Sequence, residues 1–356
     1  MTKSPVLKDL NQFKNPFFFL PILLVIFVLF SLLLLPQFKK DDSKIEVDQK
    51  KIDLIFATSD TRAFTELTGE IGPQIAYEII KAKYPNNDAA AHDFAHIIGI
   101  VAHDQKGMEN LKVCDTAYNY GCYHGFIEAF IAKNTVAKVS GIEDGCIALG
   151  PVHAPSCLHG IGHGVMVDAS YNLGTALENC SVLKKTSQIY CWDGVFMERI
   201  VGSMLSEKDK IKITQETLRE PCDSVATSYK EQCWRNQVSA WLPFFQGNTK
   251  EVGKQCSLIE SQYQKTCFES LGLLVTITVG ESREALISSC QVLPTSPAGG
   301  QISDDCLIGA MKELLFEGKK PDIAAHLCDA VSAPNRNYCL ATYADHLAQS
   351  QARFGR

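Results

Sequence analysis

Apolar residues recur at every third or fourth position along most of the chain, which is the spacing of an amphipathic helix. This pattern predicts helices over residues 52–67 and 73–83, and Asn87-Asp88 predicts the cap of a further helix over 89–103. Alternating strand patterns are scarce. The run 273–279 is β-like, but its place in the repeat described below predicts a buried helix. The pattern therefore predicts an all-α protein.

A long uncharged apolar run near the start of the chain predicts a membrane span. Residues 17–36 carry no charge and are enough to cross a bilayer as a helix. The run has neither a small-residue cleavage site nor a lipid-accepting cysteine, so an uncleaved anchor over 16–36 is favoured over a cleaved signal peptide. Lysines in the preceding tail, 1–15, favour a cytoplasmic N-terminus. The charged residues 37–51 are typical of a linker.

The 14 cysteines all lie between Cys114 and Cys339. Second members of neighbouring pairs recur at steps near 34 residues, the length of a two-helix solenoid repeat. Each second cysteine begins an apolar helix and each first one lies near the end of the preceding helix, so we predict local disulfides. Thiolate metal ligation requires spacings such as Cys-x2-Cys, which the sequence lacks. The predicted pairs are Cys114–Cys122, Cys146–Cys157, Cys180–Cys191, Cys222–Cys233, Cys256–Cys267, Cys290–Cys306 and Cys328–Cys339.

These patterns predict a disulfide-stapled α-solenoid of about seven two-helix repeats after one transmembrane helix. We divide the region after the linker into an N-terminal helical cap (52–87), repeats with candidate chemistry (88–203) and C-terminal helical repeats (204–356). Disulfides form in oxidising compartments, so the domain after the anchor is expected to be extracytoplasmic, either periplasmic or extracellular.

Two positions in the repeat collect histidines and acids. Two residues after the second cysteine stand His124, His159 and Asp193, and six residues after it stand Glu128, His163 and Met197, followed by Glu198. One repeat earlier, His92 and His96 fit the same two slots with Ala90 in the cysteine position. Glycine follows the first slot in all three cysteine-marked repeats. Residues four apart share one helix face, so each pair can chelate one ion.

The slots predict one or two transition-metal ions on adjacent helices. Histidine and carboxylate without thiolate suit zinc, iron, manganese or copper. Hydrogen-bonded core packing and haem ligation are the alternatives. Glu128 is expected to bridge two ions or, if unligated, to act as a general base, whereas Asp193 and Glu198 are outer contributors or a polar inner surface. The predicted ligands are His92, His96, His124, Glu128, His159 and His163.

Several function classes are disfavoured. A net charge of −6 without a basic stripe argues against nucleic-acid binding. Zinc-protease, nucleophile-elbow, phosphate-loop and dinucleotide motifs are absent from the sequence. The expected function is a membrane-anchored metalloprotein, either a hydrolase or an oxidoreductase. The alternative is a non-catalytic scaffold that binds a small molecule, peptide, glycan or protein on its concave face.

Three strings resemble those of an uncharacterised group of exported prokaryotic proteins: Gly121-Cys-Tyr-His-Gly125, Cys157-Leu-His-Gly-Ile-Gly-His-Gly164 and Cys191-Trp-Asp-Gly-Val-Phe-Met-Glu198. The resemblance covers roughly residues 88–203 and implies no activity. In architecture the chain is also similar to deoxyhypusine hydroxylase, a helical-repeat protein that holds two irons with histidines and glutamates. The repeated His-Glu dipeptides of that family are missing, so the similarity implies no residue roles.

Overall fold

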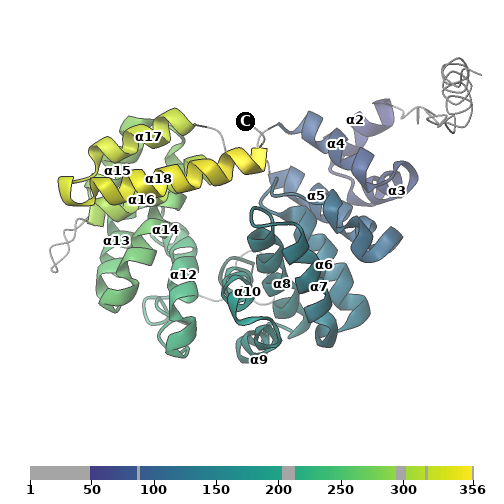
Figure 1. Ribbon diagram of the computed structural model, residues 1–356, viewed down its shortest axis with the longest axis horizontal. Helices are drawn as coiled ribbons and strands as arrows, with labels where there is room; N and C mark the ends of the chain where they lie inside the picture. Colours follow the sequence, from purple (N-terminus) through teal and green to yellow (C-terminus); the bar gives the residue numbers. More distant parts are fainter. Residues whose placement is uncertain (1–48, 86–88, 203–212, 294–301, 317–319, 355–356) are drawn as a thin grey trace, which may run out of the picture. The chain divides into compact units, whose positions relative to one another are not determined.

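The computed structural model describes residues 49–85, 89–202, 213–293, 302–316 and 320–354, and there every regular element is helical (Figure 1). The all-α prediction is therefore confirmed for the described residues. The helices before residue 203 are α2 (Gln49–Thr58), α3 (Thr61–Ile71), α4 (Pro73–Lys83), α5 (Ala89–Lys106), α6 (Gly121–Asn134), α7 (Val139–Ala148), α8 (Ala154–Asp168), α9 (Leu173–Asn179) and α10 (Lys185–Met197).

The C-terminal part of the chain is also a series of consecutive helices. They are α12 (Lys230–Phe244), α13 (Thr249–Leu258), α14 (Ser261–Val279), α15 (Arg283–Gln291), α16 (Ile302–Phe316), α17 (Pro321–Ala330) and α18 (Ala333–Phe354). Shorter helical turns are η2 (Gly107–Val113), η3 (Val136–Lys138), η4 (Cys180–Val182) and η6 (Thr227–Tyr229), all 3-10, and η5 (Glu198–Gly202), which is a π-helix.

The first predicted helical run, 52–67, consists of two helices. Ser59 ends α2 with a left-handed φ of 51°, and the Asp60 side chain caps α3 by accepting a hydrogen bond from the backbone N–H of Ala63 at 2.9 Å. The second run matches α4, which begins at Pro73 because proline suits the first turn of a helix. α2 begins at Gln49, inside the predicted linker.

Some predictions fall on parts of the chain that the structure leaves out. The tail (1–15), the anchor (16–36), nearly all of the linker (37–51) and the cap at Asn87-Asp88 lie outside the described residues. Among the helices that the structure does describe, none combines the length and the apolar run that a bilayer crossing requires. The anchor therefore stays a prediction.

All seven predicted disulfides are present. They join Cys114–Cys122, Cys146–Cys157, Cys180–Cys191, Cys222–Cys233, Cys256–Cys267, Cys290–Cys306 and Cys328–Cys339. The Cα atoms of the joined residues lie 5.2–5.8 Å apart. No cysteine among the described residues is free. A chain with this many bridges points to an oxidising, extracellular environment.

Most bridges join the end of one helix to the next helix, as predicted. Cys146 near the end of α7 is bonded to Cys157 in α8, for example. Cys222 departs from this rule because it lies in a run of turns rather than at a helix end, yet it still reaches Cys233 in α12. The disulfide therefore depends on the chain reversal and not on the helix before it.

Three pairs of helices pack with their backbones in contact: α5 with α6, α8 with α10, and α14 with α16. A Cβ atom at Gly162 would lie 2.1 Å from the carbonyl oxygen of Cys191, and one at Gly194 would lie 2.0 Å from that of His159. Only glycine fits such an approach. The same two contacts recur as Gly99–Cys122 and Gly125–His96 in the first pair and as Gly272–Cys306 and Gly309–Glu269 in the third.

This shared register corrects the predicted alignment of α5. Gly99 contacts Cys122 as Gly162 contacts Cys191, and Gly162 stands five residues after Cys157. The cysteine position of α5 is therefore five residues before Gly99, at Phe94 rather than Ala90. His96 then takes the first slot, and His92 lies one turn before it.

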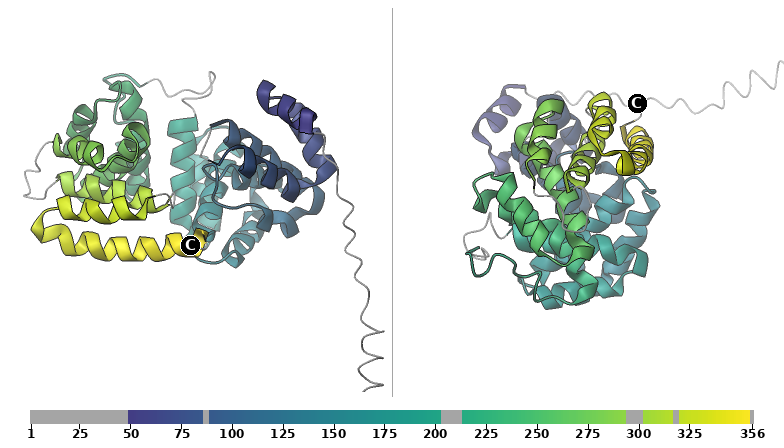
Figure 2. Two further views of the ribbon diagram at one scale, coloured as in Figure 1. Left: turned by 90° about the horizontal axis from the view of Figure 1, so that it is seen from above. Right: turned by 90° about the vertical axis from the view of Figure 1, so that its left-hand side faces the viewer.

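The β-like run 273–279 belongs to α14, as predicted, but its burial is only partial. Val275 and Thr276 are buried, whereas Leu273 and Ile277 are 37% and 65% exposed. α16 packs against α14, α17 and α18 (Figures 1 and 2). Because α14 turns only one face towards α16, its apolar residues Leu273, Ile277 and Val279 remain at the surface.

Asp305 lies near the start of α16, and the stability of the fold depends on whether its carboxyl group is protonated. Burial and the neighbouring charge of Glu269 raise the pKa of Asp305 from 3.8 to about 6. The folded chain therefore binds this proton more tightly than the unfolded chain, and stability falls as the pH rises through roughly 4 to 6. We expect Asp305→Asn to raise the free energy of unfolding by about 1 kcal/mol at neutral pH and to change it little near pH ~4. Thermal unfolding at both pH values measures this, and equal differences at the two would contradict it.

Candidate metal centre

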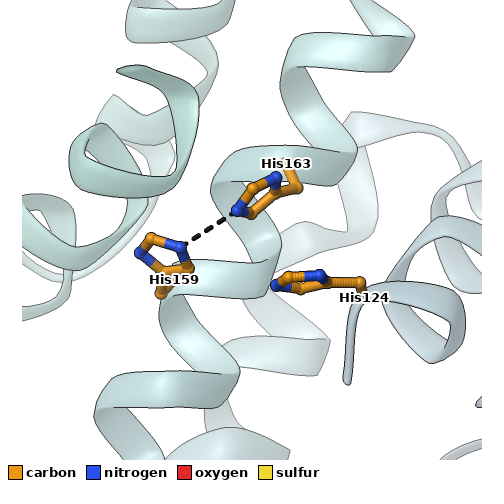
Figure 3. A group of neighbouring side chains, drawn as sticks. All are labelled: His124, His159 and His163. Atoms are coloured by element: carbon orange, nitrogen blue, oxygen red, sulfur yellow. Dashed lines mark hydrogen bonds between the residues drawn. The ribbon is translucent and has the colours of Figure 1, made fainter. Parts of the chain in front are cut away.

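Three histidines from two packed helices meet at one point (Figure 3). His124 comes from α6, and His159 and His163 lie one turn apart on α8. The Nε2 atoms of His159 and His163 are 3.0 Å apart, and one ring nitrogen from each of the three residues lies within 4.8 Å of the others. The ring centre of His163 is 4.2 Å from that of His124. This group could hold a metal ion.

Small residues on α8 bring the two helices together. A Cβ atom at Gly160 would lie 2.8 Å from the Cδ1 of Ile127, and one at Gly164 would lie 2.6 Å from the Cδ1 of Ile131. These contacts seat α8 on α6, so the ring of His124 reaches the pair on α8. The sequence thus builds the cluster from helical spacing on one helix and glycine packing against the next.

Two carboxylates from α10 and its π-helical extension η5 stand behind the histidines. The Nδ1 atom of His159 is 3.0 Å from Oδ2 of Asp193, and the Nδ1 atom of His163 is 2.8 Å from Oε2 of Glu198. The other oxygen of Asp193 accepts a hydrogen bond of 2.9 Å from the side-chain amide of Asn236 on α12. Both acids therefore orient the rings instead of pointing at the cluster.

Hydrogen bonds and nearby charges keep both acids ionised. Burial by itself raises the pKa of Asp193, but the bond with His159 and the charge of Arg235 bring it below its ordinary value. Burial also raises the pKa of Glu198, and the bond with His163 again brings the net pKa below the ordinary value. Each carboxylate is thus ionised and accepts a hydrogen bond from the Nδ1–H of the ring in front of it.

Two of the histidines are kept neutral by burial. Burial lowers the pKa of His163, and it lowers the pKa of His124 much further, with the neighbouring histidines adding to the effect. Neutral imidazole is the form that binds metal ions.

The positions of the ring protons follow from these contacts. In His159 and His163 the Nδ1 atom faces a carboxylate, which only accepts, so Nδ1 carries a proton in each ring and the lone pair of a neutral ring is on Nε2. The two Nε2 atoms face each other at 3.0 Å, close enough for both to bind one cation when neither carries a proton. The Nε2 atom of His124 is also buried and has no hydrogen-bond partner among the described residues. An unsatisfied buried nitrogen costs about 1–3 kcal/mol, and a metal ion would remove that cost.

Of the six predicted ligands, the structure brings three into one group, His124, His159 and His163. His96 does not join the cluster; its Nε2 lies 3.2 Å from Oε2 of Glu128, so these two predicted ligands contact each other. His92 packs its ring 5.6 Å from that of His124, and its Nδ1 is 2.8 Å from the backbone oxygen of Tyr118. The register of α5 places His92 outside the first slot, and His96 takes that slot but contacts Glu128.

Sequence reasoning located the outer acids but missed their supports. The second slot of this repeat holds Met197, yet Glu198, one residue later, is the side chain that contacts His163. The register shifts because α10 changes to a π-helix at Glu198, where the turn is wider. Asn236 stands three residues after Cys233, where earlier repeats have glycine, so the repeat alignment was the signal that could have identified it. Tyr171, which donates a hydrogen bond of 2.9 Å to Oε1 of Glu198, follows no spacing rule.

Comparisons of the chain with protein-family models, with curated proteins and with solved structures find no match. Function is therefore inferred from the chemistry of the described side chains.

Proposed function

We propose that this protein binds one transition-metal ion through the Nε2 atoms of His124, His159 and His163. The observation that supports the proposal most directly is the convergence of three imidazoles, each with a ring nitrogen within 4.8 Å of the others, together with the buried Nε2 of His124, which has no hydrogen-bond partner among the described residues. Asp193 and Glu198 would lie behind the ligands and orient two of them, since a metal-binding histidine usually donates its other N–H to a carboxylate.

Zinc is the ion that this ligand set favours. Three imidazoles leave one coordination position open in a tetrahedral site, which is the arrangement in which zinc binds and activates water in proteins. Iron, manganese and copper, which the sequence also predicts, bind imidazole as well. A site with an open position serves chemistry, whereas a purely structural zinc site has four protein ligands.

The reaction we propose is metal-dependent hydrolysis of an extracytoplasmic substrate. When bound, the ion would supply an activated water molecule. Glu128 lies one turn after His124 on the same face of α6, its side chain is 47% exposed, and the bond with His96 lowers its pKa. It is thus an ionised carboxylate that substrate and water can reach, and we assign it the role of general base, with His96 as its hydrogen-bond partner.

Elemental analysis of the purified full-length chain tests the metal assignment. We expect about one ion per chain after exposure to zinc and removal of excess metal. Hydrolysis of model esters and phosphoesters should disappear with a chelator and return with zinc. A chain that neither carries nor takes up metal would contradict the whole proposal, and a metal-loaded chain without hydrolytic activity would contradict only the reaction.

Asp193→Asn is expected to weaken metal binding about tenfold, since partners of metal-bound histidines typically contribute tenfold to a hundredfold to affinity. Asparagine keeps the shape of the side chain but removes the charge that faces the N–H of His159. Competition with a chromophoric chelator measures the affinity. Asp144→Asn, which removes an exposed carboxylate bonded to Lys184, is the control and should leave the affinity unchanged.

For the fold we propose a disulfide-stapled solenoid in which the second helices of successive repeats stack in chain order. The contacts of α6 with α8, α8 with α10, α10 with α12, α12 with α14 and α14 with α16 support this arrangement. An experimental structure tests it, and a different stacking order would rule it out.

We also propose that residues 16–36 anchor the chain in a membrane with the helical domain outside the cytoplasm. The apolar run in the sequence and the seven disulfides support this placement. Alkaline extraction of membranes should leave the full-length chain in the membrane pellet. Its release into the soluble fraction would count against an anchor.

A further inference from the structure

Tyr171 adopts a backbone conformation that a tyrosine rarely takes. It follows α8 in a turn where Ser170 has a φ of 49° and Tyr171 a φ of 61°. These values lie in the left-handed region, where a side chain with a Cβ atom is disfavoured and glycine is not. A bulky residue persists in such a position only where the surrounding structure fixes it.

The chain contains the same turn with glycine in it. After α12, Gln246 has a φ of 54° and Gly247 a φ of 78°. The backbone N–H of Tyr171 donates to the oxygen of Met166 at 3.0 Å, and that of Gly247 donates to the oxygen of Leu242 at 2.8 Å. The remaining bonds also correspond: Ala169–Val165 with Phe245–Trp241, Ser170–Val167 with Gln246–Pro243, and Asn172–Ala169 with Asn248–Phe245.

The two turns occupy equivalent places in the repeat. Gly247 lies 76 positions after Tyr171, and Cys233 lies 76 positions after Cys157. The alignment that matches the two turns therefore also matches the two cysteines. The repeat with glycine in the turn has Arg235 where the other has His159. The strained tyrosine thus occurs in the repeat that carries two of the three clustered histidines, and the unstrained glycine occurs in one that carries none.

The side chain of Tyr171 accounts for this difference. Its hydroxyl donates to Oε1 of Glu198 at 2.9 Å, while Oε2 of the same carboxylate faces Nδ1 of His163 at 2.8 Å. On a third side, a Cβ atom at Gly202 would lie 2.4 Å from Oε1 of Glu198, so the absence of a side chain there makes room for the carboxylate. Glu198 is therefore held in one orientation by two hydrogen-bonding neighbours, in the space that Gly202 leaves open.

We propose that Tyr171 is a positioning residue of the metal centre. By holding Glu198, it keeps the proton of His163 on Nδ1 and directs the Nε2 lone pair towards His124 and His159. The inference rests on the proposed function, because it assigns Tyr171 a part in metal affinity and ligand geometry.

Tyr171→Phe removes the hydroxyl and keeps the ring. We expect the zinc dissociation constant of the full-length chain to rise about tenfold, at the low end of the effect of second-layer partners. We also expect the visible absorption of the cobalt-substituted protein to change, because the field at the ion depends on the orientation of His163. Tyr171→Gly should show the same loss of affinity, although glycine is the better residue for this backbone.

Tyr77→Phe is the matched control. It also removes a tyrosine hydroxyl that donates to a carboxylate, in this case Asp115 at 2.6 Å, but away from the cluster. It should change neither the affinity nor the cobalt spectrum.

The outcomes separate the two proposals. If the unaltered chain binds no metal, the proposed function fails. If it binds metal and Tyr171→Phe has the same affinity and cobalt spectrum, only the role of Tyr171 fails. A loss of affinity in Tyr77→Phe equal to that in Tyr171→Phe would also overturn it, since the effect would then be one of general stability.

Discussion

Replacing His163 with alanine is expected to abolish stoichiometric metal binding. His163 stands at the centre of the cluster, with its Nε2 atom 3.0 Å from that of His159 and its ring centre 4.2 Å from that of His124. Loss of a partner behind a ligand costs up to about a hundredfold in affinity, so loss of the ligand itself should cost at least that much. Elemental analysis and zinc titration of the purified full-length chain measure the effect.

The control for this prediction is His96→Ala. This histidine is also a predicted ligand, but it contacts Glu128 at 3.2 Å and lies outside the group of three. We expect His96→Ala to retain about one metal ion per chain, and both variants to keep the helical circular dichroism of the parent. If His96→Ala abolishes binding as completely as His163→Ala, the site includes more than three histidines, and the six-ligand prediction is supported instead.

The disulfides were predictable from the sequence because local spacing alone determines them. Each bridge closes a short reversal between neighbouring cysteines, with a sequence separation of 8 to 16 residues. A chain with only one nearby partner per cysteine has little choice of pairing. The helical class followed for a similar reason, since apolar spacing of three and four is a property of each segment by itself.

The histidine group was harder to predict because it depends on how helices stack. On α6 and α8 a cysteine marks the register, and both slots of α8 and the first slot of α6 reach the cluster. α5 has no cysteine, so the sequence allowed an alignment one turn away from that set by Gly99 and Gly125. These glycines were visible in the sequence, but their partners across the interface were not.

The role of each acid was also beyond the sequence. Asp193 and Glu198 occupy positions from which they bond to Nδ1 atoms, whereas Glu128 reaches His96 instead of the cluster. Which oxygen faces which nitrogen depends on side-chain rotation and on the π turn after α10, and neither is a property of spacing. The slots therefore identified the residue types and the helix face, and packing divided them into a group of three histidines and the carboxylates that contact two of them.

Gly309→Ala is expected to destabilise the C-terminal helices by at least about 3 kcal/mol, at the upper end of the usual cost of overpacking. A Cβ atom at Gly309 would lie 1.9 Å from the carbonyl oxygen of Glu269, and that oxygen belongs to the backbone of α14 and cannot rotate away. The two helices would have to separate. We expect the midpoint of thermal unfolding to fall by roughly 5–10 °C, measured by circular dichroism with the disulfides intact.

Gly141→Ala distinguishes this packing effect from the general effect of glycine in helices. Gly141 lies inside α7, and a Cβ atom there would meet nothing within 4 Å. Alanine is the better helix former by about 1 kcal/mol, so this variant should be as stable as the parent or slightly more so. Opposite signs for the two substitutions would show that backbone contact, and not helix propensity, requires glycine at position 309. The same contact geometry at Gly194 joins α8 to α10, so the glycine register that stabilises the C-terminal pair is also what places Asp193 behind His159.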